Sequence, residues 1–127
     1  MNIEFNTKKY ELSDDIKKYV EKKIGKLDRK LSRKIRPTIF AKVMLKENAQ
    51  VKKGRFSCEV VLYLPNQQII VEEATINMFA AVDIVESRLK NQISKYHSKH
   101  TEHRTERRKV YEKFRKLADR DFRSKQN

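Results

Sequence analysis

The sequence contains little glycine or cysteine and has no long apolar run. Its two glycines, Gly25 and Gly54, lie 29 residues apart, which excludes both the P-loop and the dinucleotide-binding glycine motifs. The single cysteine, Cys58, excludes an intrachain disulfide and a zinc site built from several cysteines of the chain. Because no apolar run approaches the roughly 20 residues that span a bilayer, we expect no membrane partner.

The pattern of a secretory leader, with charged, then apolar, then small residues, is also absent from residues 1–15. A free cysteine suits a reducing compartment, so we expect a cytoplasmic protein. The length of 127 residues allows one compact domain with a tail, and we place the domain at residues 1–100 and the tail at residues 101–127.

Acidic residues are also scarce, because 17 Asp and Glu oppose 31 Lys and Arg, for a net charge of +14. The excess is uneven along the chain. Residues 17–36 hold 10 basic and 2 acidic residues, and residues 101–127 hold 10 and 5, whereas residues 37–76 hold 5 and 4. A polyanionic partner is therefore the leading hypothesis.

Hydrophobic periodicity predicts the first two elements. Residues 2–6 alternate between apolar and polar as in a half-buried strand, and Ser13 fits the N-cap of the helix that follows. The helix is expected to run for about four turns and to stop before Pro37. Its apolar stripe consists of Ile16, Val20, Ile24, Leu27 and Leu31.

From Thr38 the period changes to two, and three strands joined by short loops predict an antiparallel meander ending near Glu73. Asn77 fits the cap of a second helix of more than five turns. One apolar sheet face and two apolar helix stripes can bury each other. We therefore predict an α+β fold of order β-α-β-β-β-α, a two-layer sandwich with two helices on one face of a four-stranded sheet, plus a basic C-terminal helical tail.

Lysines recur at every fourth residue of the first predicted helix, from Lys18 to Lys30. An ordinary solvated helix face mixes charges, because like charges four residues apart cost about 0.2–0.5 kcal/mol per pair. A ladder of like charges therefore favours phosphate binding over a merely solvated face. The second helix adds a polar stripe, and two neighbouring helices would merge both into one basic surface suited to folded RNA. That stripe consists of Arg88, Gln92, Lys95 and Lys99.

Catalytic and metal-binding patterns are weak. Cys58 alternates with apolar strand residues and is interpreted as core, and Glu72 and Glu73 are adjacent strand residues that point to opposite faces. His97, His100 and His103 are spaced by three, with Glu102 and Glu106 nearby, but this pattern favours a solvated junction over a metal site. We predict no enzyme, no cofactor and no small-molecule substrate.

Two motifs carry a family resemblance. Met78-Phe79-Ala80-Ala81-Val82-Asp83, followed by Arg88-Leu89, Gln92-Ile93 and Lys95, resembles the signature of the ribosome hibernation-promoting factor family, also called ribosome-associated inhibitor A or sigma factor modulation proteins. The first helix, from Ile16-Lys17 to Asp28-Arg29, is similar as well, and the likeness covers about residues 1–99. Departures are Asn77 in place of an aspartate, Phe79 in place of a tyrosine, and Asn91 where an arginine is common.

The resemblance implies a protein that binds the small ribosomal subunit and its ribosomal RNA in the channel used by mRNA and tRNA. It would inhibit translation and preserve idle ribosomes under stress in stationary phase. Carried over to this chain, the expected RNA contacts are Lys23, Lys26, Arg29, Arg88, Gln92, Lys95 and Lys99, and the charge ladder adds Lys22 and Lys30.

The tail departs from long family members, because nothing after His100 resembles the second domain that pairs two ribosomes. The chain is then a short form or a fragment, and we expect a monomer. We predict that the tail adds RNA affinity, with contacts from Arg104, Arg107, Arg108 and Lys109.

Two other functions remain open. The α-β-β-β-α part of the predicted order is close to that of a double-stranded RNA-binding domain, so a general duplex-RNA binder or RNA chaperone is the alternative. A third hypothesis is an adaptor whose tail helix docks on a partner protein. The aromatic strands of an RRM and the GXXG loop of a KH domain are absent from the sequence.

Overall fold

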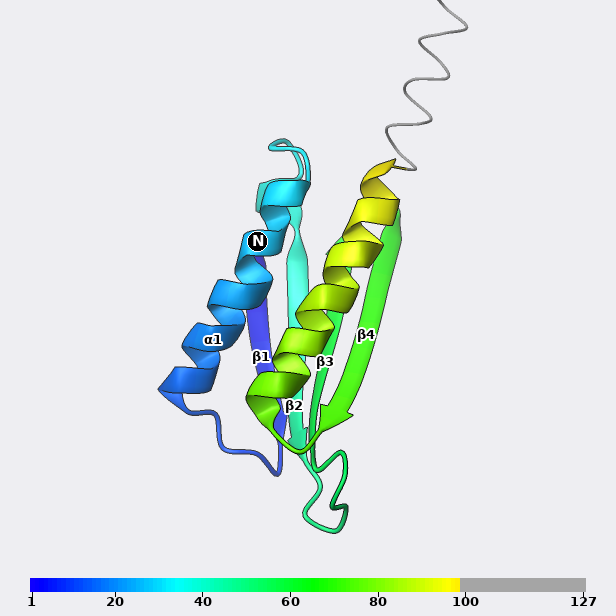
Figure 1. Cartoon of the computed structure of the whole chain (residues 1–127). Helices are drawn as coiled ribbons and strands as arrows, with labels where there is room; N and C mark the ends of the chain where they lie inside the picture. The colour runs from blue at the N-terminus through cyan, green and yellow to red at the C-terminus, as the bar shows by residue number, and fades with distance from the viewer. Residues whose placement is uncertain (99–127) are drawn as a thin grey trace, which may run out of the picture. The chain divides into compact units, whose positions relative to one another are not determined.

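The computed structural model describes residues 1–98, which form a four-stranded sheet covered on one face by helices (Figure 1). The strands are β1 (Asn2–Lys8), β2 (Phe40–Glu47), β3 (Phe56–Leu64) and β4 (Gln67–Thr75), in the spatial order β1-β2-β3-β4. β1 pairs parallel with β2, whereas β2, β3 and β4 pair antiparallel. The predicted meander is confirmed, and it is extended by one parallel edge strand.

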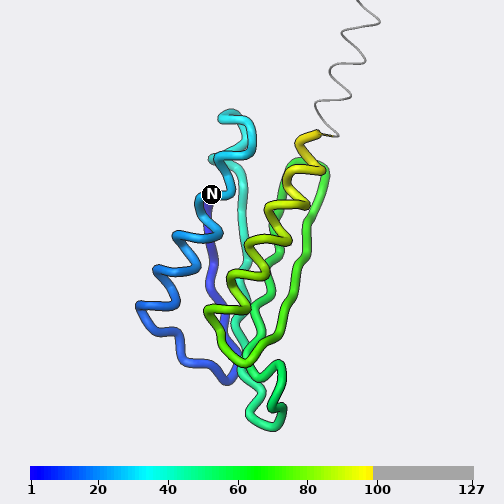
Figure 2. The backbone as a smooth tube through the Cα atoms, viewed as in Figure 1, coloured from blue at the N-terminus to red at the C-terminus, as the bar shows by residue number. Residues whose placement is uncertain are grey.

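The helices follow the predicted order. α1 (Asp14–Gly25) connects β1 to β2 together with two short 3₁₀ helices, η1 (Lys26–Lys30) and η2 (Arg36–Thr38). A second long helix occupies residues 78–98, and its part up to Ser94 belongs to the compact unit Met1–Ser94. α1 and this helix lie side by side on the same face of the sheet (Figure 2). The predicted α+β two-layer fold of order β-α-β-β-β-α is confirmed.

Both predicted helix caps are confirmed. The Ser13 hydroxyl accepts a hydrogen bond from the backbone N–H of Ile16 at 3.3 Å. The Asn77 side-chain oxygen accepts one from the N–H of Phe79 at 2.7 Å. Each bond satisfies a donor that the first helical turn leaves without an intrahelical partner.

The first helix is shorter than predicted. Its α-helical part ends at Gly25, and the chain continues as the 3₁₀ helix η1, so Pro37 in η2 does not terminate α1. Glycine is a weak helix former, and a 3₁₀ turn still buries Leu27 and Leu31. The expected ladder of lysines is consequently split, because Lys18 and Lys22 lie in α1 whereas Lys26 and Lys30 lie in η1.

The core lies between the sheet and the helices, and the strands alternate sharply about it. On β4, Ile69 is 3% exposed on the helix side, whereas its neighbour Ile70 is 62% exposed on the other. Cys58 is fully buried on β3, and this burial raises the pKa of its thiol to about 12. The interpretation of Cys58 as a core residue is confirmed.

The other side of the sheet has no helix over it and is called the open face, defined by the outward residues of β1 to β4 (Figure 1). It mixes charged and apolar side chains, with Glu4 opposite Lys42 and the rings of Phe40 and Tyr63 in tilted contact at 5.8 Å between centroids. Within residues 1–98, no helix combines the length and apolar character that crossing a bilayer requires.

Candidate nucleic-acid interface

The outward side chains of α1, η1 and residues 78–94 form what we call the helix surface. The line along which the two long helices meet is called the seam, and it consists of Tyr19 and Lys23 on α1, Lys26 at the start of η1, and Phe79, Asp83 and Glu86 on the second helix.

Salt bridges join the helices along the seam. The Lys23 ammonium lies 3.8 Å from Asp83 and 3.7 Å from Glu86, and Lys26 lies 3.6 Å from the other oxygen of Glu86. The Glu86 side chain is only 14% exposed, whereas Lys23 and Lys26 are 30% and 50% exposed. Two predicted RNA contacts are thus brought together, and both already have an acidic neighbour.

Tyr19 anchors the lower end of the seam. Its hydroxyl donates a hydrogen bond to the Asp83 carboxylate, and this bond raises the pKa of Tyr19 to about 12. The ring packs edge-on against Phe79 at 5.0 Å, and the Lys23 ammonium lies 5.6 Å from the Tyr19 ring centroid. These contacts fix the spacing of the two helices and the position of Lys23 between them.

Other predicted cations stay free at the surface. Lys22, Arg29 and Lys30 are exposed, and none has a salt bridge to any of the residues that the structure describes. The acid within η1, Asp28, instead pairs with the Met1 ammonium at 3.1 Å. Lys22, Arg29 and Lys30 therefore present uncompensated positive charge.

The η1 turn that carries Arg29 and Lys30 is held by another arginine. The Arg36 guanidinium donates hydrogen bonds to the carbonyl oxygens of Asp28, Arg29 and Leu31, at 3.0, 2.9 and 3.1 Å. These carbonyls lie at the C-terminal end of η1, where a helix leaves acceptors unsatisfied, and the Asp28 oxygen also accepts from the Leu31 N–H at 2.9 Å, so Arg36 acts as a cap of this end. Although Arg36 belongs to the same basic segment, its guanidinium is engaged in hydrogen bonds to the chain's own backbone.

The second helix separates its predicted contacts. Arg88 turns toward the sheet edge, where it pairs with the Glu73 carboxylate and donates to the Glu72 carbonyl at 3.1 Å. Gln92 and Lys95 are exposed. Lys99 and the tail residues predicted to bind RNA lie outside the described residues, namely Arg104, Arg107, Arg108 and Lys109.

The acidic side of the seam was not predicted from the sequence. Asp83 and Glu86 are three residues apart, as are Lys23 and Lys26, so matching charge spacing on two predicted helices was an available signal. No group of three potential metal-binding side chains occurs within residues 1–98, and His100 and His103 fall beyond them.

Comparisons with known proteins place this arrangement in a family. The family described as "Sigma 54 modulation protein / S30EA ribosomal protein" matches residues 3–101. The chain belongs to this family, as its resemblance predicted.

Two relatives are named ribosome hibernation promotion factor. The one from Lactococcus lactis subsp. cremoris (strain MG1363) is 34% identical over 98 residues, covering 74% of this chain and 49% of the relative. The one from Staphylococcus aureus (strain COL) is 31% identical over 85 residues, covering 67% and 42%. The chain thus spans about half the length of these curated relatives.

Solved structures share the fold. The N-terminal domain of Thermus thermophilus Protein Y has a TM-score of 0.65 and 31% identity, covering 76% of this chain and 99% of that one. A ribosomal subunit interface protein from Coxiella burnetii has a TM-score of 0.63 and 23% identity, covering 77% and 99%, and shows the fold alone.

Proposed function

We propose that this chain is a ribosome hibernation factor that binds the small ribosomal subunit through its helix surface. There it would occupy the channel of mRNA and tRNA, inhibit translation and preserve idle ribosomes. Family membership and the names of the relatives support a ribosomal role. The proposal rests on one structural observation: Lys22, Arg29 and Lys30 are exposed on the helix surface without a salt bridge among residues 1–98, and Lys23 and Lys26 lie beside them at the seam.

The chemistry fits ribosomal RNA better than a single DNA groove. Lys22, Arg29 and Lys30 project from a short α-helix and a 3₁₀ turn, and Lys23 and Lys26 lie in the seam beside them. Such contacts recognise phosphates and shape, and they carry no base-specific information. A folded RNA with closely spaced phosphates is therefore the partner we assign to this surface. In a cell, the protein would be cytoplasmic and ribosome-associated.

The test is co-sedimentation of the full chain with purified small ribosomal subunits. We expect binding that is lost when mRNA and initiator tRNA are bound first, because the ligands share the channel. Binding that is unaffected by these ligands would contradict occlusion. Equal binding to a naked RNA duplex would favour the duplex-RNA alternative.

Variants link that result to the helix surface. Exchanging both Lys22 and Lys30 for glutamine removes two exposed charges without breaking a described salt bridge. Lys42→Gln on the open face is the control, and we expect it to bind like the wild type. Lys26 is less suitable, because its loss would also leave Glu86 with one partner fewer.

A further inference from the structure

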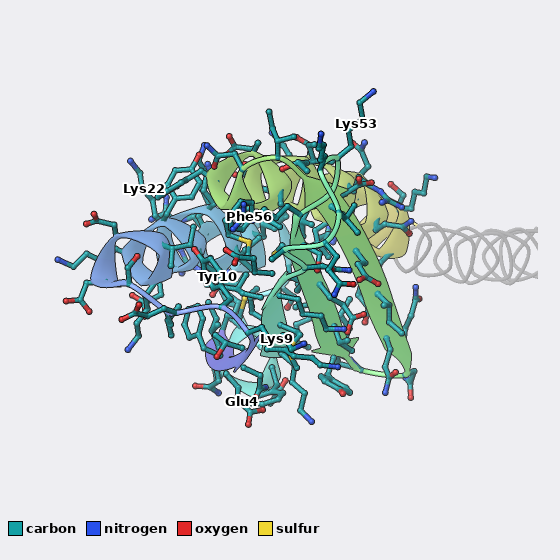
Figure 3. All side chains as sticks on the ribbon, turned by 90° about the horizontal axis from the view of Figure 1, so that it is seen from below. Glu4, Lys9, Tyr10, Lys22, Lys53 and Phe56 are labelled. Carbon is teal, nitrogen blue, oxygen red and sulfur yellow. The ribbon has the colours of Figure 1, made fainter. Side chains whose placement is uncertain are left out.

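A hollow of about 480 Å³ is lined by residues at the ends of β1 and β2 and of the loop that follows β2. This end of the sheet lies away from η1 and on the side where α1 begins (Figure 1). Figure 3 looks at this end of the molecule from below, with Lys9 and Tyr10 labelled. The hollow is lined by Lys8, Lys9, Lys46, Glu47, Asn48, Ala49 and Gln50. None of these residues belongs to the helix surface.

The lining has an excess of positive charge. Lys8, Lys9 and Lys46 have no salt bridge within residues 1–98. Glu47 is the one carboxylate among the lining residues, and it is paired with Arg55 at 3.4 Å. The three ammonium groups are therefore not neutralised by the described part of the chain.

Parallel pairing forces two of these lysines together. Lys8 on β1 and Lys46 on β2 are register partners, and both lie on the open-face side of their strands. Like charges at paired positions of neighbouring strands destabilise a sheet. An anion bound between them would remove that repulsion.

The third lysine is held in an unfavourable backbone conformation. Lys9 has a φ of 53°, in the left-handed region that costs a residue with a Cβ atom. Strain of this kind persists where the surrounding structure imposes it, and it is frequent at binding sites. Next to it, Tyr10 packs edge-on against Phe56 with 6.1 Å between ring centroids, which fixes the chain after Lys9.

The opposite wall is also ordered by its own hydrogen bonds. The backbone N–H of Asn48 donates to the Arg55 carbonyl at 2.7 Å, and the Asn48 side-chain oxygen accepts from the N–H of Gln50 at 3.2 Å. Gly54, with a φ of 85°, closes the loop from residue 48 to residue 55. Asn48 and Gln50 thus line the hollow with side-chain amides, and hydrogen bonds hold the backbone that carries them.

We propose that this hollow binds the phosphate groups of an anionic ligand, separately from the helix surface. Three ammonium groups suit a ligand with several negative charges, and the volume falls in the range of sites that hold small molecules. A free oligophosphate or nucleotide and the backbone of an RNA strand share this chemistry. The site does not depend on the proposed ribosome binding.

The test uses tripolyphosphate as the probe, added to the ¹⁵N-labelled full chain at moderate salt. We expect amide shifts at residues 8–9 and 46–50 that saturate. Replacing both Lys8 and Lys46 with glutamine should weaken this binding by about tenfold or more, because each lost charged hydrogen bond has that order of effect. The matched control replaces Lys22 and Lys30 instead and should keep the shifts.

A second variant separates binding from stability. Lys9→Gly relieves the left-handed backbone and removes a charge, so we expect an equal or higher Tm together with weaker tripolyphosphate binding. A titration with a short single-stranded RNA then identifies the source: shifts at the same residues assign RNA phosphates, and shifts with tripolyphosphate alone assign a free ligand.

Either source supports the site. Absence of shifts at residues 8–9 and 46–50 with both probes would overturn it. Wild-type affinity in the Lys8 and Lys46 double variant would overturn it as well. Co-sedimentation with ribosomal subunits is read separately, so the failure of this site and the failure of the proposed function are distinguishable.

Discussion

The helix surface and the open face carry charge in different ways, although they cover the same sheet. On the open face, opposite charges are register partners in the middle of β1 and β2, where Glu4 lies beside Lys42, and like charges are partners at the end, where Lys8 lies beside Lys46. On the helix surface, Asp83 and Glu86 at the seam form salt bridges with Lys23 and Lys26, and exposed cations such as Lys22 and Lys30 have no salt bridge among residues 1–98. Because Asp83 and Glu86 are engaged between the helices, they do not neutralise Lys22 and Lys30. One surface can therefore hold both the salt bridges that stabilise the fold and charged side chains that have no salt bridge.

The largest effect should come from β4, where two identical neighbours face opposite sides. Ile69→Ala should lower the free energy of unfolding by about 2–5 kcal/mol, because it leaves a cavity in the core. Ile70→Ala should change it by less than about 1 kcal/mol, since its side chain is largely exposed. Urea unfolding measures both. Equal losses would mean that the open face is covered in solution.

The next effect concerns RNA binding. Lys22→Gln and Lys30→Gln should each weaken binding to small subunits and each lower the slope of log affinity against log salt by about one. Lys42→Gln should leave the slope unchanged. A salt titration of co-sedimentation measures this. A similar slope change for all three variants would erase the distinction between the two faces.

A change at the seam is expected to have two smaller effects, a loss of stability and a gain in affinity for the small subunit. Glu86→Gln removes the acid that Lys23 and Lys26 share, so stability should fall by about 0.5–1 kcal/mol, a modest value because both lysines are partly exposed. The same change frees positive charge, and subunit affinity should rise by a few-fold. Glu59→Gln on the open face is the control. Weaker binding by the Glu86 variant would show that its salt bridges position the lysines for RNA.

The smallest effect is a pH dependence. The pKa of Tyr19 is raised in the folded chain from its ordinary value of 10.0 to about 12, chiefly by its hydrogen bond to Asp83. The stability from this bond is therefore fully present below pH 10 and is lost as the pH rises toward 12. Alkaline titration of tyrosine absorbance should show this late component, and Tyr19→Phe should remove it. If the titration is unchanged in the variant, the late component does not come from Tyr19.

Much of the fold could be predicted because each element has its own period. Alternation along β4 predicts that Ile69 is buried and Ile70 exposed, as the structure shows. The helical stripe from Met78 to Tyr96 is a local pattern too, and its residues are buried as predicted. The end of α1 was predicted wrongly, since Leu27 and Leu31 are buried in a 3₁₀ helix as they would be in an α-helix. Periodicity cannot distinguish these two cases.

The candidate sites depended on pairings between distant segments. Exposed lysines could be predicted from helical spacing, but the contact of Lys23 with Glu86 requires the lateral offset of two helices. The approach of Lys8 to Lys46 requires a parallel pairing with a strand that follows a whole helix. Neither contact can be predicted from a local sequence pattern. The family resemblance supplied the proposed partner, and the structure separated the cations that form salt bridges from those that form none among residues 1–98.

The parallel pairing of β1 also has a consequence for the order of assembly. β2, β3 and β4 are joined by short connections, so their hairpins close with little loop entropy, whereas β1 reaches β2 only after α1, η1 and η2 have been traversed. We expect the meander to form first and β1 to dock last. In native-state hydrogen exchange, amides of β1 should then open before those of β3, which makes the edge that carries Lys8 the most readily released part of the sheet.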